Sequence, residues 1–175
     1  FEAGGHNGIE ELTTFCLIPL IKKHIDLPLI AAGGIGSGQT MLAAMSLGAE
    51  GVQIGSRFVV SKESSAHINF KNAIIDSKAG DTILTLKELT PVRMLKNAFY
   101  KKVEDAYLKN KSTEQLRELL GRGRAKKGMF EGDLEYGELE IGQISAYLNK
   151  IHSAKDIIED IMKDFYLTRN SINEL

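Results

Sequence analysis

The sequence predicts an α/β protein whose strands are parallel. Two short apolar runs, residues 29–32 and 52–54, each end in glycine, and a helical segment, residues 39–47, lies between them. Strand, glycine turn, helix, strand and glycine turn follow one another as in a βαβ unit. Buried parallel strands are continuous apolar runs rather than alternating ones, and residues 29–32 have this character.

The glycine turns that follow the two predicted strands are the main functional signal. The first begins with Gly33 and Gly34, and the second contains Gly55 and Ser56. Glycines at the carboxyl ends of neighbouring strands let the backbone approach a ligand and direct N–H groups at an anion. In (β/α)8 barrels the turns after the seventh and eighth strands are the common phosphate site. One such turn alone is usually structural, but two in succession at this spacing favour phosphate binding.

A glycine-rich loop around a single histidine comes before these turns. Residues 1–8 contain His6 and three glycines, a composition that suits neither a helix nor a strand. Histidine has an unperturbed pKa near neutrality, which suits proton transfer. A loop histidine alone is usually an ordinary surface residue. Because His6 lies one βα unit before the phosphate turns, we expect it at the same mouth of a barrel, in a catalytic role.

These motifs together resemble the FMN-dependent nitronate monooxygenase superfamily, which includes the bacterial enoyl-acyl carrier protein (ACP) reductase II. The stretches that carry the resemblance are residues 2–6, 11–14, 31–35 and 47–58. Residues 59–71 and 142–144 favour the reductase branch. Ser56 departs from the family, where threonine is more common, but it keeps the hydroxyl group.

The resemblance implies a (β/α)8 TIM barrel, of which this chain carries only the last strands plus a helical carboxyl-terminal region. Residues 1–64 would be the end of an FMN-binding barrel. Residues 65–175 would be a mostly helical region that packs on the barrel and contributes to the substrate pocket. Such a barrel takes roughly 250 residues, so 175 residues with two barrel strands cannot close one. We therefore expect the amino-terminal half of the barrel as a necessary partner.

The resemblance also assigns roles to individual residues. His6 would be catalytic, and Gln143 is a candidate for the substrate pocket. NADH or NADPH would be the co-substrate. The spacing of the histidines and acidic residues itself predicts no metal ligand. The residues expected to bind FMN are Ala32, Gly33, Gly34, Gln53, Ile54, Gly55 and Ser56.

The activity implied by the resemblance is NAD(P)H-dependent reduction of trans-2-enoyl-ACP thioesters in fatty acid synthesis. A nitronate monooxygenase would keep the fold and the flavin, place His6 beside a nitronate, and use oxygen as the electron acceptor. An inactive flavin-binding or scaffold fragment is the third reading. The expected partners are an ACP thioester or a small nitronate, and a second copy of the chain in a homodimer.

Composition adds little to this interpretation. Hydrophobic residues make up 43% and charged residues 26% of the chain, both ordinary for a globular domain. The formal net charge of -1 gives no reason to expect a nucleic acid or a membrane as partner. No stretch approaches the ~20 apolar residues of a membrane-spanning helix. The single cysteine, Cys16, lies in an apolar run and is expected to be a small core residue of a reduced, cytoplasmic protein.

The rest of the chain is predicted to be mainly helical. The expected elements are a helix at 66–78, a strand at 82–86, and helices at 92–108, 114–120, 141–151 and 154–167. The basic run 121–128 is interpreted as a solvated or salt-bridged loop, because acidic residues follow it directly. A surface for an acidic carrier protein or a dinucleotide phosphate is the alternative.

Overall fold

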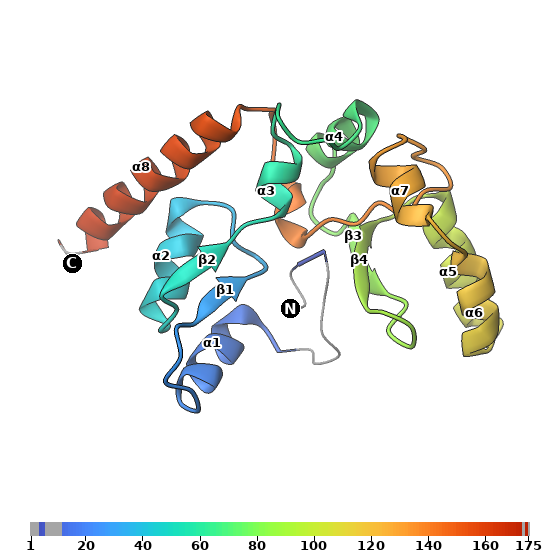
Figure 1. Ribbon diagram of the computed structural model, residues 1–175, viewed down its shortest axis with the longest axis horizontal. Helices are drawn as coiled ribbons and strands as arrows, with labels where there is room; N and C mark the ends of the chain where they lie inside the picture. The colour runs from blue at the N-terminus through green and yellow to red at the C-terminus, as the bar shows by residue number, and fades with distance from the viewer. Residues whose placement is uncertain (1–3, 6–11, 173, 175) are drawn as a thin grey trace.

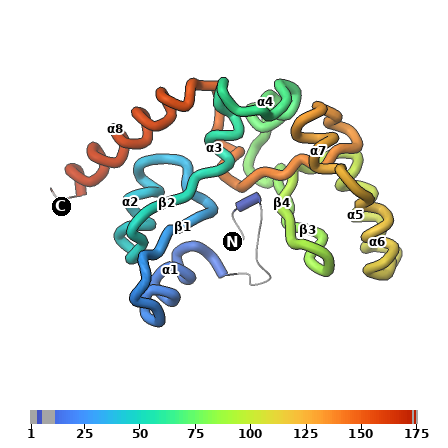
Figure 2. Tube along the Cα trace, viewed as in Figure 1, coloured from blue at the N-terminus to red at the C-terminus, as the bar shows by residue number. Residues whose placement is uncertain are grey.

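The computed structural model describes residues 4–5, 12–172 and 174. Figure 1 shows an arch, with the first strand pair on one side, the second on the other and α8 extending outward. The Cα trace in Figure 2 shows the same arrangement of the two strand pairs and the helices. The elements are α1 (Thr14–Lys22), β1 (Ile30–Ala32), α2 (Gly38–Ser46), β2 (Gly51–Gln53), α3 (Ser56–Val59), α4 (Ile68–Ile75), β3 (Thr82–Thr85), β4 (Val92–Leu95), α5 (Ala98–Leu108), α6 (Thr113–Leu120), α7 (Arg124–Met129), η1 (Gln143–Tyr147) and α8 (Ala154–Ile172).

The predicted βαβ unit is confirmed. Strands β1 and β2 pair in parallel with Ala31 opposite Val52, and α2 connects them. Helix α2 begins with a capping box, in which the Ser37 hydroxyl accepts from the Thr40 backbone N–H and the Thr40 hydroxyl accepts from the Ser37 N–H. The core of this unit is a small apolar cluster made of Ile18, Ala31, Ile35, Ala44 and Ala49. The cluster holds α1 and α2 against β1.

The second strand pair corrects one prediction. Residues 92–108 were expected to form one helix, but Val92–Leu95 is β4, which pairs antiparallel with β3. All four residues of β4 are buried, because the strand also bridges to Glu140 on its other side. Helix α5 begins only after Asn97, whose side chain accepts from the Tyr100 N–H as an N-cap. Apolar residues continue at helical spacing from β4 into α5, so the sequence pattern did not indicate the strand.

The remaining helices follow the prediction in part. Helices α4, α6 and α8 are confirmed; α6 begins after an N-cap at Ser112 and ends at Leu120, before Gly121. The helix expected over 141–151 is only a short 3-10 turn, η1. The basic run, predicted as a loop, overlaps α7 from residue 124 onward. Its Arg124 guanidinium donates to the carbonyl oxygens of Leu119, Leu120 and Tyr136, so this cation stabilises the fold.

Cys16 corrects a second prediction, since it is exposed rather than part of the core. The buried residue of α1 is Ile18, two positions further along the helix. At 3.6 residues per turn, two positions correspond to roughly 200° around the axis. Packing Ile18 against β1 therefore turns Cys16 outward.

Helix α8 crosses the start of α2 at very close range. A Cβ atom added at Gly38 would overlap the backbone of Phe165 and the carbonyl oxygen of Ile161. The Asp164 carboxylate accepts from the Gln39 N–H at 2.9 Å, next to the amino terminus of α2, where negative charge is favourable. Among the described helices, none is both long and apolar enough to cross a membrane.

Candidate functional site

The two glycine turns border one cavity of about 470 Å³. The parallel pairing of β1 and β2 brings their carboxyl ends to the same edge, so the turns lie side by side. Six of the seven residues predicted to bind the cofactor line this cavity: Ala32, Gly33, Gly34, Gln53, Gly55 and Ser56. The seventh, Ile54, packs against the apolar cluster of the βαβ unit instead.

The first turn depends on glycine for its backbone conformation. Gly33 and Gly34 have φ values of 90° and 75°, in the left-handed region that side chains disfavour. Two such residues in succession turn the chain sharply away from the end of β1. The Thr14 hydroxyl donates to the Gly33 carbonyl at 3.3 Å, which ties this turn to α1.

The second turn uses glycine for space rather than conformation. Gly55 has a φ of −98°, which any residue adopts. A Cβ atom at this position would meet no atom within 4 Å. The cavity therefore reaches the Gly55 backbone only because no side chain fills it. Beside it, the Ser56 hydroxyl accepts from the Gly142 N–H at 2.9 Å.

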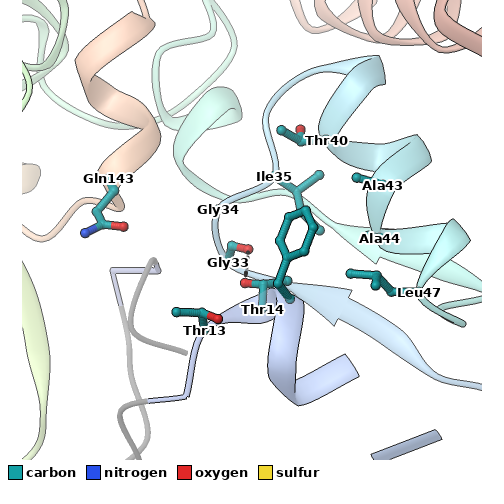
Figure 3. Close-up of a pocket in the computed structure, with 11 residues that line it drawn as sticks. Thr13, Thr14, Gly33, Gly34, Ile35, Thr40, Ala43, Ala44, Leu47 and Gln143 are labelled. Carbon is teal, nitrogen blue, oxygen red and sulfur yellow. Dashed lines mark hydrogen bonds between the residues drawn. The ribbon is translucent and has the colours of Figure 1, made fainter. Parts of the chain in front are cut away.

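A second pocket, of about 220 Å³, lies on the other side of the first turn, between α1 and α2 (Figure 3). Gln143 borders this pocket together with Gly33 and Gly34. In Figure 3 it stands on η1, apart from the α2 residues Ala43 and Ala44. The next residue, Ile144, lines the larger cavity. The predicted substrate residue is therefore at the edge of the site, and Ile144 is a wall residue that sequence reasoning missed.

His6 lies outside the described residues, and its catalytic role stays a prediction. Gly4 and Gly5, which precede it, line the larger cavity. The Gly5 carbonyl accepts from the Arg93 N–H at 2.8 Å, so β4 anchors the loop at this point.

Two glutamates near the cavity were not predicted. Glu140 lines the cavity, and Glu138 is 7% exposed. Burial, with a contribution from the Glu140 carboxylate, raises the pKa of Glu138 to about 7, while the Arg124 guanidinium opposes the rise. The alternation of Glu138, Leu139 and Glu140 is typical of an extended segment with both carboxylates on one side. This spacing is the sequence signal that could have distinguished Glu138 and Glu140 from the other acidic residues that follow the basic run.

Comparison with known proteins decides the family. A family model described as nitronate monooxygenase matches residues 1–164. The chain belongs to the nitronate monooxygenase family.

The chain aligns with only part of the length of its relatives in this family. A probable nitronate monooxygenase of Staphylococcus saprophyticus is 36% identical over 93% of this chain and 48% of its own length. A similar protein of Staphylococcus aureus is 33% identical over 99% of this chain and 49% of its own. The chain thus spans about half the length of the curated relatives it matches.

Solved structures of the same superfamily match the whole of this chain. FabK from Thermotoga maritima has 40% identity and a TM-score of 0.90, over 99% of this chain and 54% of that one. A nitroalkane oxidase from Streptomyces ansochromogenes has 25% identity and a TM-score of 0.74, over 98% and 51%. These matches confirm the predicted fold class, the last strands of a TIM barrel followed by a helical region.

Proposed function

We propose that this chain is the cofactor-binding part of an FMN-dependent oxidoreductase that reduces trans-2-enoyl-ACP thioesters with NADH or NADPH. The observation that carries the proposal is the cavity shared by the two glycine turns. The reductase reading is supported by the 40% identity to FabK, an enoyl-ACP reductase.

The residues present fit an FMN phosphate. The cavity of about 470 Å³ is within the range of roughly 300–1,000 Å³ usual for small-molecule sites. At Gly55 the backbone is open to the cavity because a side chain is missing there. Ser56 adds a hydroxyl that can donate to an anionic oxygen. Gly33, Gly34, Gly55 and Ser56 would hold the phosphate, and FMN, when bound, supplies the two-electron redox chemistry.

The other residues of the chain have supporting roles in this proposal. Apolar side chains of Val59, Ile141 and Ile144 exclude water from the cavity that they line. Reduction of the double bond needs a proton at the α-carbon and a partner for negative charge on the thioester oxygen. We assign one of these tasks to His6, on the sequence argument alone. The earlier strands of the barrel, outside this chain, would complete the flavin site.

A nitronate monooxygenase is the second candidate. The names of the matched curated relatives favour it, since they are probable nitronate monooxygenases at 33–36% identity. It would use the same FMN cradle and His6, with oxygen as the electron acceptor and no nicotinamide.

Anaerobic mixing of the complete enzyme with NADH distinguishes the two candidates. The reductase is expected to lose its flavin absorbance at about 450 nm within the time of a few turnovers. Addition of a trans-2-enoyl thioester should restore this absorbance. A flavin that stays oxidised under NADH but is reduced by an alkyl nitronate would support the monooxygenase instead. Absence of flavin from the complete protein would contradict both.

A further inference from the structure

The short helix η1 contacts both glycine turns of the proposed flavin site. The Ile144 side chain covers Gly36 in the first turn, where an added Cβ would lie 2.7 Å from Ile144 Cδ1. At the other turn, the Gly142 N–H donates to the Ser56 hydroxyl at 2.9 Å, between residues 86 positions apart in the chain. Gly142 is the N-cap of η1. The start of η1 is therefore held by a side chain that itself borders the cavity.

The Ser56 hydroxyl has an unused donor. A hydroxyl group offers one proton and two acceptor lone pairs. Within the described part of the chain, this hydroxyl accepts from Gly142 and donates to no protein group. An anionic oxygen in the cavity can accept a hydrogen bond from it. Hydrogen bonds in series polarise one another, so donation to an anion strengthens the bond accepted from Gly142.

Helix η1 in turn shapes both pockets. Ile144, 4% exposed, lines the larger cavity, and Gln143 borders the smaller one. A change in how firmly Gly142 is held is therefore transmitted to residues on the walls of both pockets. The path is short, because Gly142 directly precedes these two residues in the chain.

We propose that Ser56 is a positioning residue that couples phosphate binding to the placement of η1. Its hydroxyl donates to the FMN phosphate and accepts from the Gly142 N–H, so the cofactor tightens the segment that carries Gln143 and Ile144. The inference rests on the proposed function, since it needs FMN at this site. It adds a mechanism by which loss of FMN loosens the segment that carries Gln143 and Ile144.

Hydrogen exchange at the Gly142 amide tests the coupling. The complete enzyme is stripped of flavin, and exchange is measured with and without saturating FMN. In the parent, FMN should slow exchange of this amide about tenfold, as one strengthened hydrogen bond would. Ser56→Thr, which keeps the hydroxyl, should respond like the parent. In Ser56→Ala the slowing should be absent even at saturating FMN, and KM for the enoyl thioester should rise more than kcat falls.

A matched control removes a hydroxyl elsewhere. The Ser46 hydroxyl donates to the Leu42 carbonyl within α2, so Ser46→Ala should respond to FMN as the parent does. If the parent binds FMN but exchange at Gly142 does not change, or slows equally in Ser56→Ala, the coupling is wrong and the FMN proposal stands. If the parent binds no FMN, both fall together.

Discussion

At the scale of single residues, the two turns use glycine for different physical reasons. Gly33 and Gly34 are needed for their positive φ values, whereas Gly55 is needed for the open space beside its backbone. Sequence alone could locate all three, because glycine after an apolar run indicates a turn. It could not separate the two reasons, since both depend on coordinates.

Glu138 provides a residue-scale prediction about pH. Its pKa is raised to about 7, so the folded protein binds this proton more tightly than the unfolded chain does. The stabilisation that comes from this tighter proton binding is fully present below the ordinary glutamate pKa of about 4.5. It is lost as the pH rises through about 7. Glu138→Gln should therefore raise the free energy of unfolding at pH 8, by at most about 3.5 kcal/mol at ~1.4 kcal/mol per pKa unit, and leave it unchanged at pH 4.

Urea unfolding of the complete enzyme at the two pH values measures this effect. Glu131→Gln is the control, because Glu131 is exposed and forms an ion pair with the exposed Lys126. The control should change stability by less than about 0.5 kcal/mol at either pH. Equal effects of Glu138→Gln at pH 4 and pH 8 would show that burial does not raise this pKa.

His6 gives a second residue-scale prediction. His6→Ala in the complete enzyme should leave flavin content and thermal stability nearly unchanged. Turnover of the enoyl thioester should fall by roughly 10²–10⁴-fold, as for other positioned acid–base groups. Steady-state kinetics with matched flavin content measure it. Unchanged turnover would remove His6 from the mechanism, and loss of folding would make it a structural residue.

At the scale of elements, the βαβ unit could be predicted because its strands and helix carry local signals. The apolar runs, the glycines and the Ser37 cap all lie within the segments that they define. Strand β4 could not be predicted, because its identity depends on pairing with β3 and with Glu140 far along the chain. The same is true of η1, whose N-cap residue Gly142 donates a hydrogen bond to Ser56, 86 positions earlier in the chain. Long-range pairing, rather than local preference, decides both.

Gly38 tests the packing of α8 on α2. Judged by helix propensity alone, alanine would stabilise α2 by about 1 kcal/mol. The added Cβ, however, would overlap the backbone of Phe165 and Ile161. Gly38→Ala should therefore lower the free energy of unfolding by about 1–3 kcal/mol, the usual cost of overpacking.

Denaturant unfolding of the complete apoenzyme checks the sign. Gly55→Ala is the matched control, since its Cβ meets no atom within 4 Å and its φ suits any residue. The control should be close to neutral. A Gly38→Ala variant more stable than the parent would mean that α8 does not cross α2 as closely as described.

At the scale of the whole molecule, the βαβ unit carries large apolar side chains that the described residues leave exposed. Large apolar side chains on and near α1 and β1 are exposed, namely Phe15, Leu20, Leu27 and Ile30. Parallel sheets are normally covered on both faces. Soluble monomers rarely expose apolar patches larger than roughly a few hundred Å². We propose that the earlier half of the barrel covers these side chains.

Residues 1–175 expressed alone should therefore behave poorly as a monomer. We expect aggregation, or binding of dyes that report exposed apolar surface, with recovery when the preceding half of the barrel is supplied in trans. Gel filtration and dye fluorescence measure this. A soluble monomer of residues 1–175 with a cooperative thermal transition and no dye binding would contradict the expectation.

The central claim is that the paired glycine turns hold FMN, and Gly55→Val in the complete enzyme tests it most directly. Valine at Gly55 would place its side chain in the open space beside the second turn and disturb no protein atom within 4 Å of the Cβ. The account predicts a folded protein whose FMN Kd rises at least about tenfold, a loss of about 1.4 kcal/mol, with a smaller rise for Gly55→Ala. A folded Gly55→Val enzyme that purifies yellow with the parent's flavin content would contradict it.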